Sequence, residues 1–261
     1  MDKTCLKFDR LKRNDNETAQ EWVYRALRFA VMSGQVQPGL ALTLRGVADA
    51  LDVSPMPVRE ALRRLTSEGA LQLKANRRIM VPDVNPGSLT ELIELRIKLE
   101  CHAAERALPY VTDELANELN QLNQTQNSSF YESDPEGIIL YNQKFHTHLY
   151  CAHPHPVTMP MIEQIWLRLG PLHRLALANL EEHYIKDHHV EIVQAIETRN
   201  AFGLKVAIEA DIRDGAGYIT QTKLLERYGR AEIPDLYIPG GDYIAMLEQA
   251  LPPEQAKKPE E

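Results

Sequence analysis

Four side chains in the second half of the sequence have the types and spacing that could hold a metal ion. Asn142 and His146 are four residues apart in NQKFH, which places both on one face of a helix. His189 lies in DHHVEIVQAIE and Asp211 lies in IEADIRD, each in a later segment. Imidazole nitrogens combined with carboxylate or amide oxygens suit borderline-to-hard divalent ions. The residue types alone leave a second interpretation open, because nine histidines make incidental clustering common and an interior histidine is often hydrogen-bonded core.

Arginine residues in the first half of the chain could contact nucleic acid. The segment TLRGVADALDVSPMPVREALRRLTSEGAL, residues 43–71, predicts two short helices joined by a tight turn. The second helix has Ser54 as its N-cap and Pro55 at its first position, and Gly69 closes it. Its apolar residues recur at helical spacing, which leaves Arg59 and two further arginines outside the buried stripe. This pattern predicts a recognition helix in a DNA major groove, or else an ordinary helical hairpin with solvated arginines.

The flanking segments favour the DNA-binding interpretation. Upstream, the apolar residues between Trp22 and Val31 predict one more helix, followed by the turn SGQVQPG. Downstream, the alternation in LQLKANRRIMVP predicts strands at Leu71–Leu73 and Ile79–Val81, joined by a basic tip. Three helices followed by a basic hairpin predict a winged helix-turn-helix fold over residues 18–82.

The run GQVQPG, followed by VADALDVSPMPVREALRRLTSEGAL, resembles the DNA-binding domain of the GntR superfamily. In that family the residue at Pro55 is usually an arginine, the residue at Met56 is a threonine or similar, and the residue at Asn76 is a glycine. These departures lie where base edges are read, so the operator sequence cannot be transferred from the family. Arg45 would contact chiefly phosphate, and Arg59 would contact base or phosphate. The resemblance implies DNA contacts from Arg45, Ser54, Met56, Arg59, Arg63, Asn76 and Arg77.

The distribution of charge agrees with a DNA-binding segment at one end of the chain. The net charge of −8 over 261 residues by itself argues against a nucleic-acid-binding protein. Residues 18–82, however, hold nine Lys and Arg against five Asp and Glu, whereas residues 83–261 hold fifteen against twenty-eight. A basic segment on an acidic body is the asymmetry expected when attraction to DNA is confined to one domain.

The cysteine pattern fits a reduced, cytosolic protein. Cys5, Cys101 and Cys151 are scattered and odd in number, and the sequence contains no C-x-x-C pair. The N-terminal segment is charged throughout, unlike a signal peptide, and no run of about eighteen apolar residues occurs. We therefore expect a cytoplasmic protein that does not associate with a membrane.

After the punctuated segment PDVNPG, the sequence predicts helices almost throughout. The expected helices are Leu89–Leu108, Thr112–Tyr131, Asp134–Ala152, Met161–Leu180, Glu182–Arg199 and Phe202–Arg227. The fold class is thus mainly α: a winged helix-turn-helix with a small β-hairpin wing, then an all-α antiparallel bundle of six or seven helices. The expected divisions are a flexible arm at 1–17, the winged helix at 18–82, a linker at 83–88, the helical domain at 89–227 and a tail at 228–261.

The helical part resembles the C-terminal ligand-binding domain of the FadR branch of the GntR superfamily, the FCD domain. The resemblance is carried by LRIKLECHAAERA, NQKFHTHLY and HHVEIVQAIETRNAFGLKVAIEADI. It implies that Asn142, His146, His189 and Asp211 bind a divalent metal, commonly zinc, with manganese or nickel also suited to these ligands. Two positions depart from the family pattern, since Asn142 replaces an aspartate and Asp211 replaces a histidine. Taken together, these two replacements still leave one carboxylate, that of Asp211, among the four ligands.

The resemblance also implies that an arginine helps the metal to hold the carboxylate of a small organic acid. Arg96 occupies the matching position in this sequence. It is the candidate for this role because a guanidinium binds a carboxylate through two parallel hydrogen bonds. A salt bridge from Arg96 to Glu100, one turn along the same helix, is the alternative role.

We therefore expect a homodimeric transcription regulator and not an enzyme. It would act as a repressor on a palindromic DNA operator, controlled by a small carboxylate effector bound at the metal. Two other functions stay open from the sequence. The first is a metal-responsive regulator, in which the ion itself is the effector. The second is a helical metallohydrolase, for which the sequence offers no H-E-x-x-H motif.

Overall fold

The computed structural model describes residues 6, 8, 11–74, 78–82, 86–131, 134–177 and 188–221. The predicted tail at 228–261, part of the predicted arm and the wing residues Asn76 and Arg77 lie outside the described residues. Among the helices in the described ranges, none combines the length and the hydrophobicity that crossing a membrane requires.

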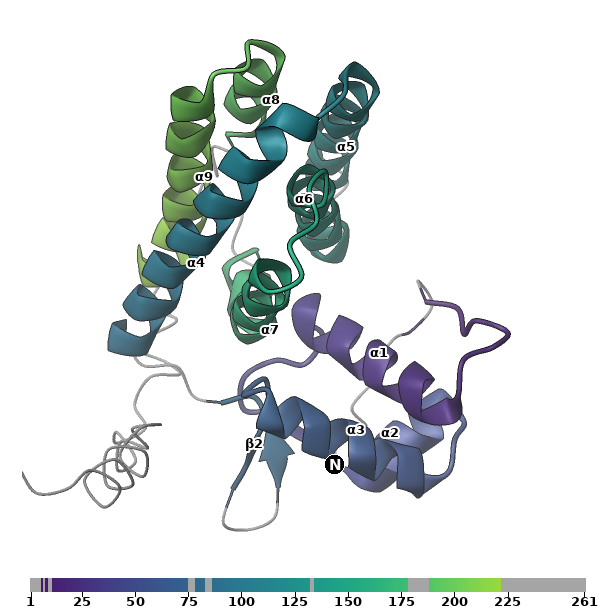
Figure 1. The fold of residues 1–261 in the computed structure, drawn as a ribbon. Helices are drawn as coiled ribbons and strands as arrows, with labels where there is room; N and C mark the ends of the chain where they lie inside the picture. Colours follow the sequence, from purple (N-terminus) through teal and green to yellow (C-terminus); the bar gives the residue numbers. More distant parts are fainter. Residues whose placement is uncertain are drawn as a thin grey trace, which may run out of the picture. The chain divides into compact units, whose positions relative to one another are not determined.

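The N-terminal part has the predicted winged helix-turn-helix architecture (Figure 1). Its elements are α1 (Ala19–Met32), β1 (Ala41–Leu42), α2 (Leu44–Leu51), α3 (Pro55–Ser67), β2 (Gln72–Leu73) and β3 (Ile79–Met80). The strands form an antiparallel sheet of order β1-β3-β2, in which Met80 is paired with both Ala41 and Gln72. The two wing strands confirm the predicted hairpin. Strand β1 was not predicted, because two residues are too few to display an alternating pattern.

Local capping interactions fix where these helices begin and end. Thr18 and Glu21 form a reciprocal capping box at the start of α1, and the Thr43 hydroxyl accepts a hydrogen bond from the Gly46 amide at the start of α2. Ser54 is the N-cap of α3 as predicted, but its side chain makes no capping hydrogen bond. At the other end of α3, Gly69 has φ +71°, the left-handed conformation that closes a helix in a Schellman motif.

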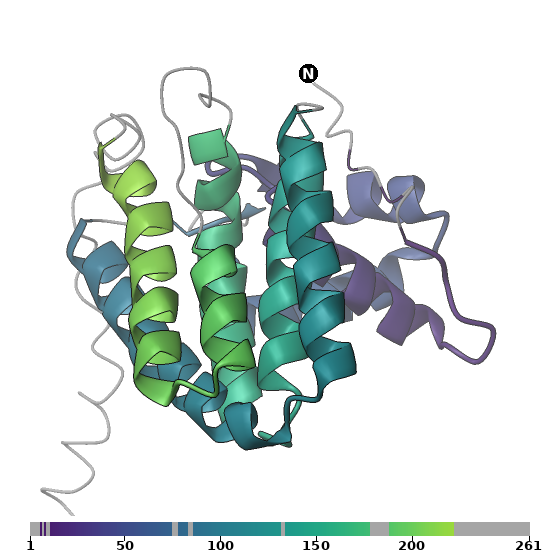
Figure 2. The same ribbon diagram turned by 90° about the horizontal axis from the view of Figure 1, so that it is seen from above.

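The C-terminal part is all helical within the described residues, as predicted. Its helices are α4 (Pro86–Ala107), α5 (Asp113–Tyr131), α6 (Pro135–Tyr150), α7 (Thr158–Leu177), α8 (His189–Glu197) and α9 (Ala201–Gln221), with a short 3-10 turn at Leu108–Tyr110. Helix α9 packs against α4 and α8, and α5 packs against α6 and α8. The helices α5 to α9, coloured teal to yellow-green, run side by side in Figure 2.

Three helices begin at least three residues away from their predicted starts. Helix α4 begins at Pro86 instead of Leu89. Helix α8 begins at His189 instead of Glu182, with His188 as its N-cap, and residues 178–187 lie outside the described ranges. Helix α7 begins at Thr158 instead of Met161 and continues through Pro171. Proline is tolerated there because the helix is held by packing on both sides, although the residue removes one backbone hydrogen bond.

Helix α7 contributes to the hydrophobic core of the winged helix as well as to its own bundle. Leu167 of α7 is fully buried in the cluster formed by the apolar residues of α1, α2 and α3. A Cβ atom at Gly170 would lie 2.5 Å from the carbonyl oxygen of Met32 at the end of α1, so only glycine permits this approach. An ion pair between Arg28 and Glu163, 2.7 Å apart, joins the same two helices.

Candidate functional site

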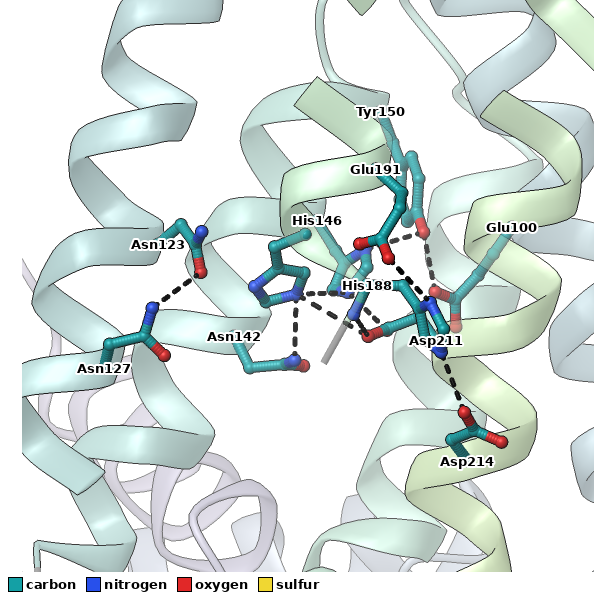
Figure 3. A network of polar contacts seen from close by, with 11 residues as sticks. Glu100, Asn123, Asn127, Asn142, His146, Tyr150, His188, Glu191, Asp211 and Asp214 are labelled. Carbon is teal, nitrogen blue, oxygen red and sulfur yellow. Dashed lines mark hydrogen bonds and ion pairs between the residues drawn. The ribbon is translucent and has the colours of Figure 1, made fainter. Parts of the chain in front are cut away.

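Three of the four predicted metal ligands lie together in the middle of the helical bundle. His146 comes from α6, His189 from the first turn of α8 and Asp211 from α9, and all three side chains are buried. His146 Nε2 lies 3.2 Å from Asp211 Oδ2 and 3.3 Å from His189 Nε2. One ligand atom from each residue lies within 4.8 Å of the other two (Figure 3). This is a spacing at which one ion can contact all three residues.

Asn142, the fourth predicted ligand, lies at the edge of this group. Its amide nitrogen is 3.3 Å from His189 Nε2, so the side chain already points to the centre. A half-turn of the Asn142 side chain exchanges its amide oxygen and nitrogen. The oxygen, which is the atom of asparagine that binds metals, would then face His189.

Glu100 lies behind the group and accepts three hydrogen bonds. Its Oε1 accepts hydrogen bonds from Arg96 Nε at 2.5 Å and Trp166 Nε1 at 2.7 Å, and its Oε2 accepts one from the Tyr150 hydroxyl at 2.8 Å. Both members of the Arg96–Glu100 ion pair are buried. A carboxylate beside a buried arginine acts only as an acceptor, so the single Tyr150 hydroxyl proton is used in the bond to Glu100.

This arrangement determines which nitrogen of His146 carries a proton. The Tyr150 hydroxyl also lies 3.0 Å from His146 Nδ1, and because its own proton is used, His146 Nδ1–H must be the donor in that contact. His146 Nε2 then presents a lone pair to Asp211 and His189 whenever the ring is neutral. A metal-ligating histidine is commonly oriented in this way, by donating its other ring N–H to a fixed acceptor.

The charges around the group favour a bound cation. Burial lowers the pKa of His189 to about 4, so its ring is neutral near pH 7. Burial acts to raise the pKa of Asp211, but the hydrogen bond that His146 donates when its Nε2 also carries a proton, together with nearby positive charge such as that of Arg96, outweighs burial and holds the pKa well below its usual range. A buried carboxylate facing two imidazole lone pairs needs a positive charge, which is either a proton on His146 or a metal ion. The donor set therefore fits a divalent ion.

Surrounding groups fix the other two ligands in place. The ring of Phe145 stacks on that of His189 with centroids 4.0 Å apart, and the backbone amide of His188 donates to Asp211 Oδ1 at 3.3 Å. His189 Nδ1 is buried without a hydrogen-bond partner among the described residues. The placement of Asp211 thus depends on the start of α8, where the N-cap residue His188 donates its backbone amide to it.

Arg96, predicted as an effector-binding residue, is held in the ion pair with Glu100 that the sequence left as its alternative role. It still lies close enough to Asp211 and His173 to influence both. Burial, followed by the charge of Arg96, lowers the pKa of His173 to about 3, and Asp211 opposes that shift. The charges of Arg96 and Asp211 thus act on His173 in opposite directions.

Sequence reasoning missed Tyr150, Trp166 and the role of Glu100 as an acceptor. A signal for Tyr150 was present, because it lies four residues after His146 on the helix face that also carries Asn142. Trp166 and Glu100 meet from different helices, and no spacing in the sequence indicates that contact.

The predicted DNA-binding residues that the structure describes lie on the exposed face of the winged helix. Arg45, Met56 and Arg59 are exposed at the surface, and Met56 has 65% of its side chain accessible. Ser54 is also exposed, and its hydroxyl is not used in helix capping. Arg63 makes an exposed ion pair with Glu60 at 3.2 Å. A groove between α3 and the wing is lined by Leu42, Thr43, Leu44, Arg59, Arg63, Thr66, Ser67, Leu73, Arg78 and Ile79.

Two protein-family models match different parts of this chain. Residues 19–81 match the family model described as bacterial regulatory proteins of the gntR family, and residues 91–214 match the FCD domain.

Individual proteins similar to this chain are bacterial regulators. The HTH-type transcriptional regulator McbR of Escherichia coli (strain K12) is 33% identical over 184 residues, which is 69% of this chain and 82% of that protein. The gluconate operon transcriptional repressor of Bacillus subtilis (strain 168) is 26% identical, over 67% of this chain and 74% of that protein. The solved structure of E. coli McbR/YncC matches with a TM-score of 0.71 and 27% identity, over 78% of this chain and 98% of that one.

Proposed function

The chain belongs to the GntR family of bacterial transcriptional regulators and carries an FCD domain, and from this premise we propose that it is a homodimeric repressor controlled by a ligand at a metal centre. Regulators of this family bind DNA, and FCD domains bind small-molecule effectors. The family members that it resembles are regulators and not enzymes. We place the DNA-binding domain at residues 18–82, the linker at 83–88 and the effector-binding domain at 89–227.

On the DNA side, we propose that α3 enters the major groove of each half of a palindromic operator. Arg59 would contact base or phosphate, Arg45 would contact phosphate, and Met56 would offer an apolar contact to a base edge. The exposure of these three side chains at the surface supports this role. Ser54, Arg63, Asn76 and Arg77 would complete the contact surface.

In the helical domain, we propose that Asn142, His146, His189 and Asp211 hold one divalent ion, with Zn²⁺ the first candidate and Mn²⁺ or Ni²⁺ also suited. The observation that carries the proposal is the convergence of His146 Nε2, His189 Nε2 and the Asp211 carboxylate. When bound, the ion would supply a positive charge for the carboxylate of a small organic acid. Arg96 and His173 would line that effector site, and Arg96 can reach the acid only with the part of its guanidinium that Glu100 leaves free.

Helix α7 is the element that we propose to connect the effector with the DNA-binding domain. On one side, Trp166 donates to Glu100 and His173 lies beside Arg96. On the other side, Leu167 and Gly170 pack against the winged helix. A small shift of α7 would therefore change the contacts of α1 directly, and effector binding could alter the placement of the winged helix.

A direct test begins with the metal content of the purified protein, measured by elemental analysis. We expect about one divalent ion per chain at this centre, lost in the His146→Ala/His189→Ala double variant. Fragments of genomic DNA selected by the protein should share a palindromic sequence and should be released on addition of a small carboxylate. A centre without metal in the wild-type protein, or equal metal content in the double variant, would contradict the ligand set.

A second candidate function is a metal-responsive regulator, in which the ion is the effector. The observation that favours it is the Arg96–Glu100 ion pair, which engages the arginine that an organic acid would require. The two candidate functions are separated by measuring operator affinity at increasing concentrations of free Zn²⁺, without any organic acid. A change in operator affinity with Zn²⁺ alone supports the metal-responsive regulator, and dependence on an added acid supports the first proposal.

A further inference from the structure

A second group of histidines lies away from the metal ligands described above. His153 and His155 belong to the sequence CAHPHP between α6 and α7, and His102 comes from α4. The rings of His153 and His155 have centroids 5.0 Å apart, and those of His102 and His155 are 6.4 Å apart. None of these residues takes part in the proposed regulator mechanism.

His155 presents an unused lone pair inside the protein. The residue is only 8% exposed, and its Nε2 has no hydrogen-bond partner among the described residues. The other ring nitrogen is held by the backbone of Ala103, whose carbonyl oxygen accepts its proton. Nε2 is therefore the unprotonated nitrogen of a neutral ring, and the ring has the backbone hydrogen bond that commonly orients a metal ligand.

His153 adds a second nitrogen of the same kind. Its Nδ1 is buried and likewise has no hydrogen-bond partner within the described part of the chain. Its ring packs against Tyr110, with centroids 4.7 Å apart, which restricts its orientation. Two buried imidazole nitrogens without partners cost free energy unless a proton donor or a cation satisfies them.

We propose that His153 and His155, joined by His102, form a second metal site that takes a nitrogen-preferring transition-metal ion such as Ni²⁺ or Cu²⁺. The donor set is imidazole alone, which suits these ions better than the oxygen-seeking Mg²⁺ or Ca²⁺. Pro154 and Pro156 follow the two histidines and restrict the backbone, so little entropy is lost when an ion binds. His102 is exposed and can turn toward the pair.

An ion at this site would act on the beginning of α7. The amide of Met159, in the first turn of α7, donates to the carbonyl oxygen of His155. Ordering of the His153–His155 segment would therefore stiffen the helix that carries Glu163 and Leu167 to the winged helix.

The test is the number of Ni²⁺ ions bound per chain, measured on the full-length protein by equilibrium dialysis and elemental analysis. We expect about two ions in the wild-type protein, about one in His153→Gln/His155→Gln and about one in His146→Gln/His189→Gln. The matched control is His148→Gln, a half-exposed histidine on α6, which should bind as many ions as the wild-type protein.

Each outcome assigns the sites separately. If His153→Gln/His155→Gln binds as many ions as the wild-type protein, the second site does not exist, whatever the state of the first. If only His153→Gln/His155→Gln loses an ion, the second site stands and the metal centre of the proposed function fails. If circular dichroism shows that the double variant folds poorly, the single variant His153→Gln replaces it in the ion count. In addition, Cu²⁺ is added to the His146→Gln/His189→Gln protein, in which the second site alone is intact. Electron paramagnetic resonance should then detect nitrogen coupling to copper, and its absence would overturn the proposal.

Discussion

The Tyr150 hydroxyl oxygen lies 3.0 Å from His146 Nδ1, whereas the other ring nitrogen, Nε2, is the one that we propose to bind a metal ion. The hydroxyl donates its proton to Glu100, so it can only accept from His146. A single phenol group thus decides that Nε2, and not Nδ1, carries the lone pair of the neutral ring, on the side where Asp211 and His189 lie. In the proposed metal centre, Tyr150 and Glu100 would therefore orient the ligand His146.

We predict that Tyr150→Phe lowers the affinity for Zn²⁺ by about tenfold to a hundredfold, the range found when the groups that orient metal ligands are lost. The ring stays in place, but His146 Nδ1 loses its acceptor and the favoured tautomer is no longer enforced. Competition with a zinc-binding dye measures the effect. Tyr141→Phe, which removes the same atom from the same helix, should leave the affinity unchanged, and an equal loss in both variants would contradict the assignment.

We predict that the metal-free protein loses stability as the pH falls from about 6.5. Burial lowers the pKa of His189 to about 4 and that of His173 to about 3, both from 6.5. Below pH 6.5 the unfolded chain therefore binds more protons than the folded one, and the free energy of unfolding decreases until the pH passes the folded pKa values. Urea denaturation at a series of pH values should give a smaller decrease for His173→Gln than for the wild type. Identical pH profiles would show that His173 is not buried in a neutral form.

We predict that Arg59→Ala weakens operator binding by about tenfold to a hundredfold, as expected for an arginine that contacts base or phosphate. The side chain is exposed, so the fold should not change. Fluorescence anisotropy with the selected operator measures the affinity. Arg213→Ala, which removes an exposed arginine from α9, is the control and should bind the operator normally. Unchanged affinity in Arg59→Ala would remove α3 from the role of recognition helix.

We predict that Gly170→Ala destabilises the protein by about 1–3 kcal/mol, the usual cost of forcing an atom into a packed contact. The added Cβ would lie 2.5 Å from the Met32 carbonyl oxygen and 2.7 Å from that of Val31, and backbone atoms cannot easily give way. Gly215→Ala is the matched control, because a Cβ there meets nothing within 4 Å and alanine favours a helix. Thermal melts that rank the two variants equally would contradict the contact between α7 and α1.

We predict that Arg96→Met costs about 3–5 kcal/mol of unfolding free energy, because it leaves the buried Glu100 carboxylate without its ion-pair partner. Arg213→Met, which breaks an exposed pair with Glu209, should cost less than about 1 kcal/mol. Chemical denaturation compares the two. A small loss for Arg96→Met would mean that Arg96 is free of Glu100 and available to bind an effector carboxylate.

The sequence predicted the fold because local rules decide most of it. Pro55 and Gly69 mark the limits of the recognition helix, and the apolar spacing of the later segments predicts a helical bundle. It also identified His146, His189 and Asp211 through the resemblance to a family, and the structure brings these three together.

The sequence could not predict contacts between elements far apart along the chain. Glu100 meets Trp166 and Tyr150 only because α4, α6 and α7 pack together, and no periodicity records which helices are neighbours. The two-residue strand β1 exists only because β3 lies beside it. The role of Arg96 was likewise undecided, because a salt bridge to Glu100 and an effector contact require the same residue at the same spacing.

The position of Leu167 also matters to anyone who recombines regulators of this kind. This residue of the helical domain completes the interior of the winged helix, so the two parts are not independent modules that can be exchanged at the linker. A chimaera that takes a foreign DNA-binding head would need a compatible side chain at 167 and a glycine at 170. During evolution, the DNA-binding domain and α7 should therefore change together. Transfer of this domain between regulators should succeed when the matching α7 is transferred with it.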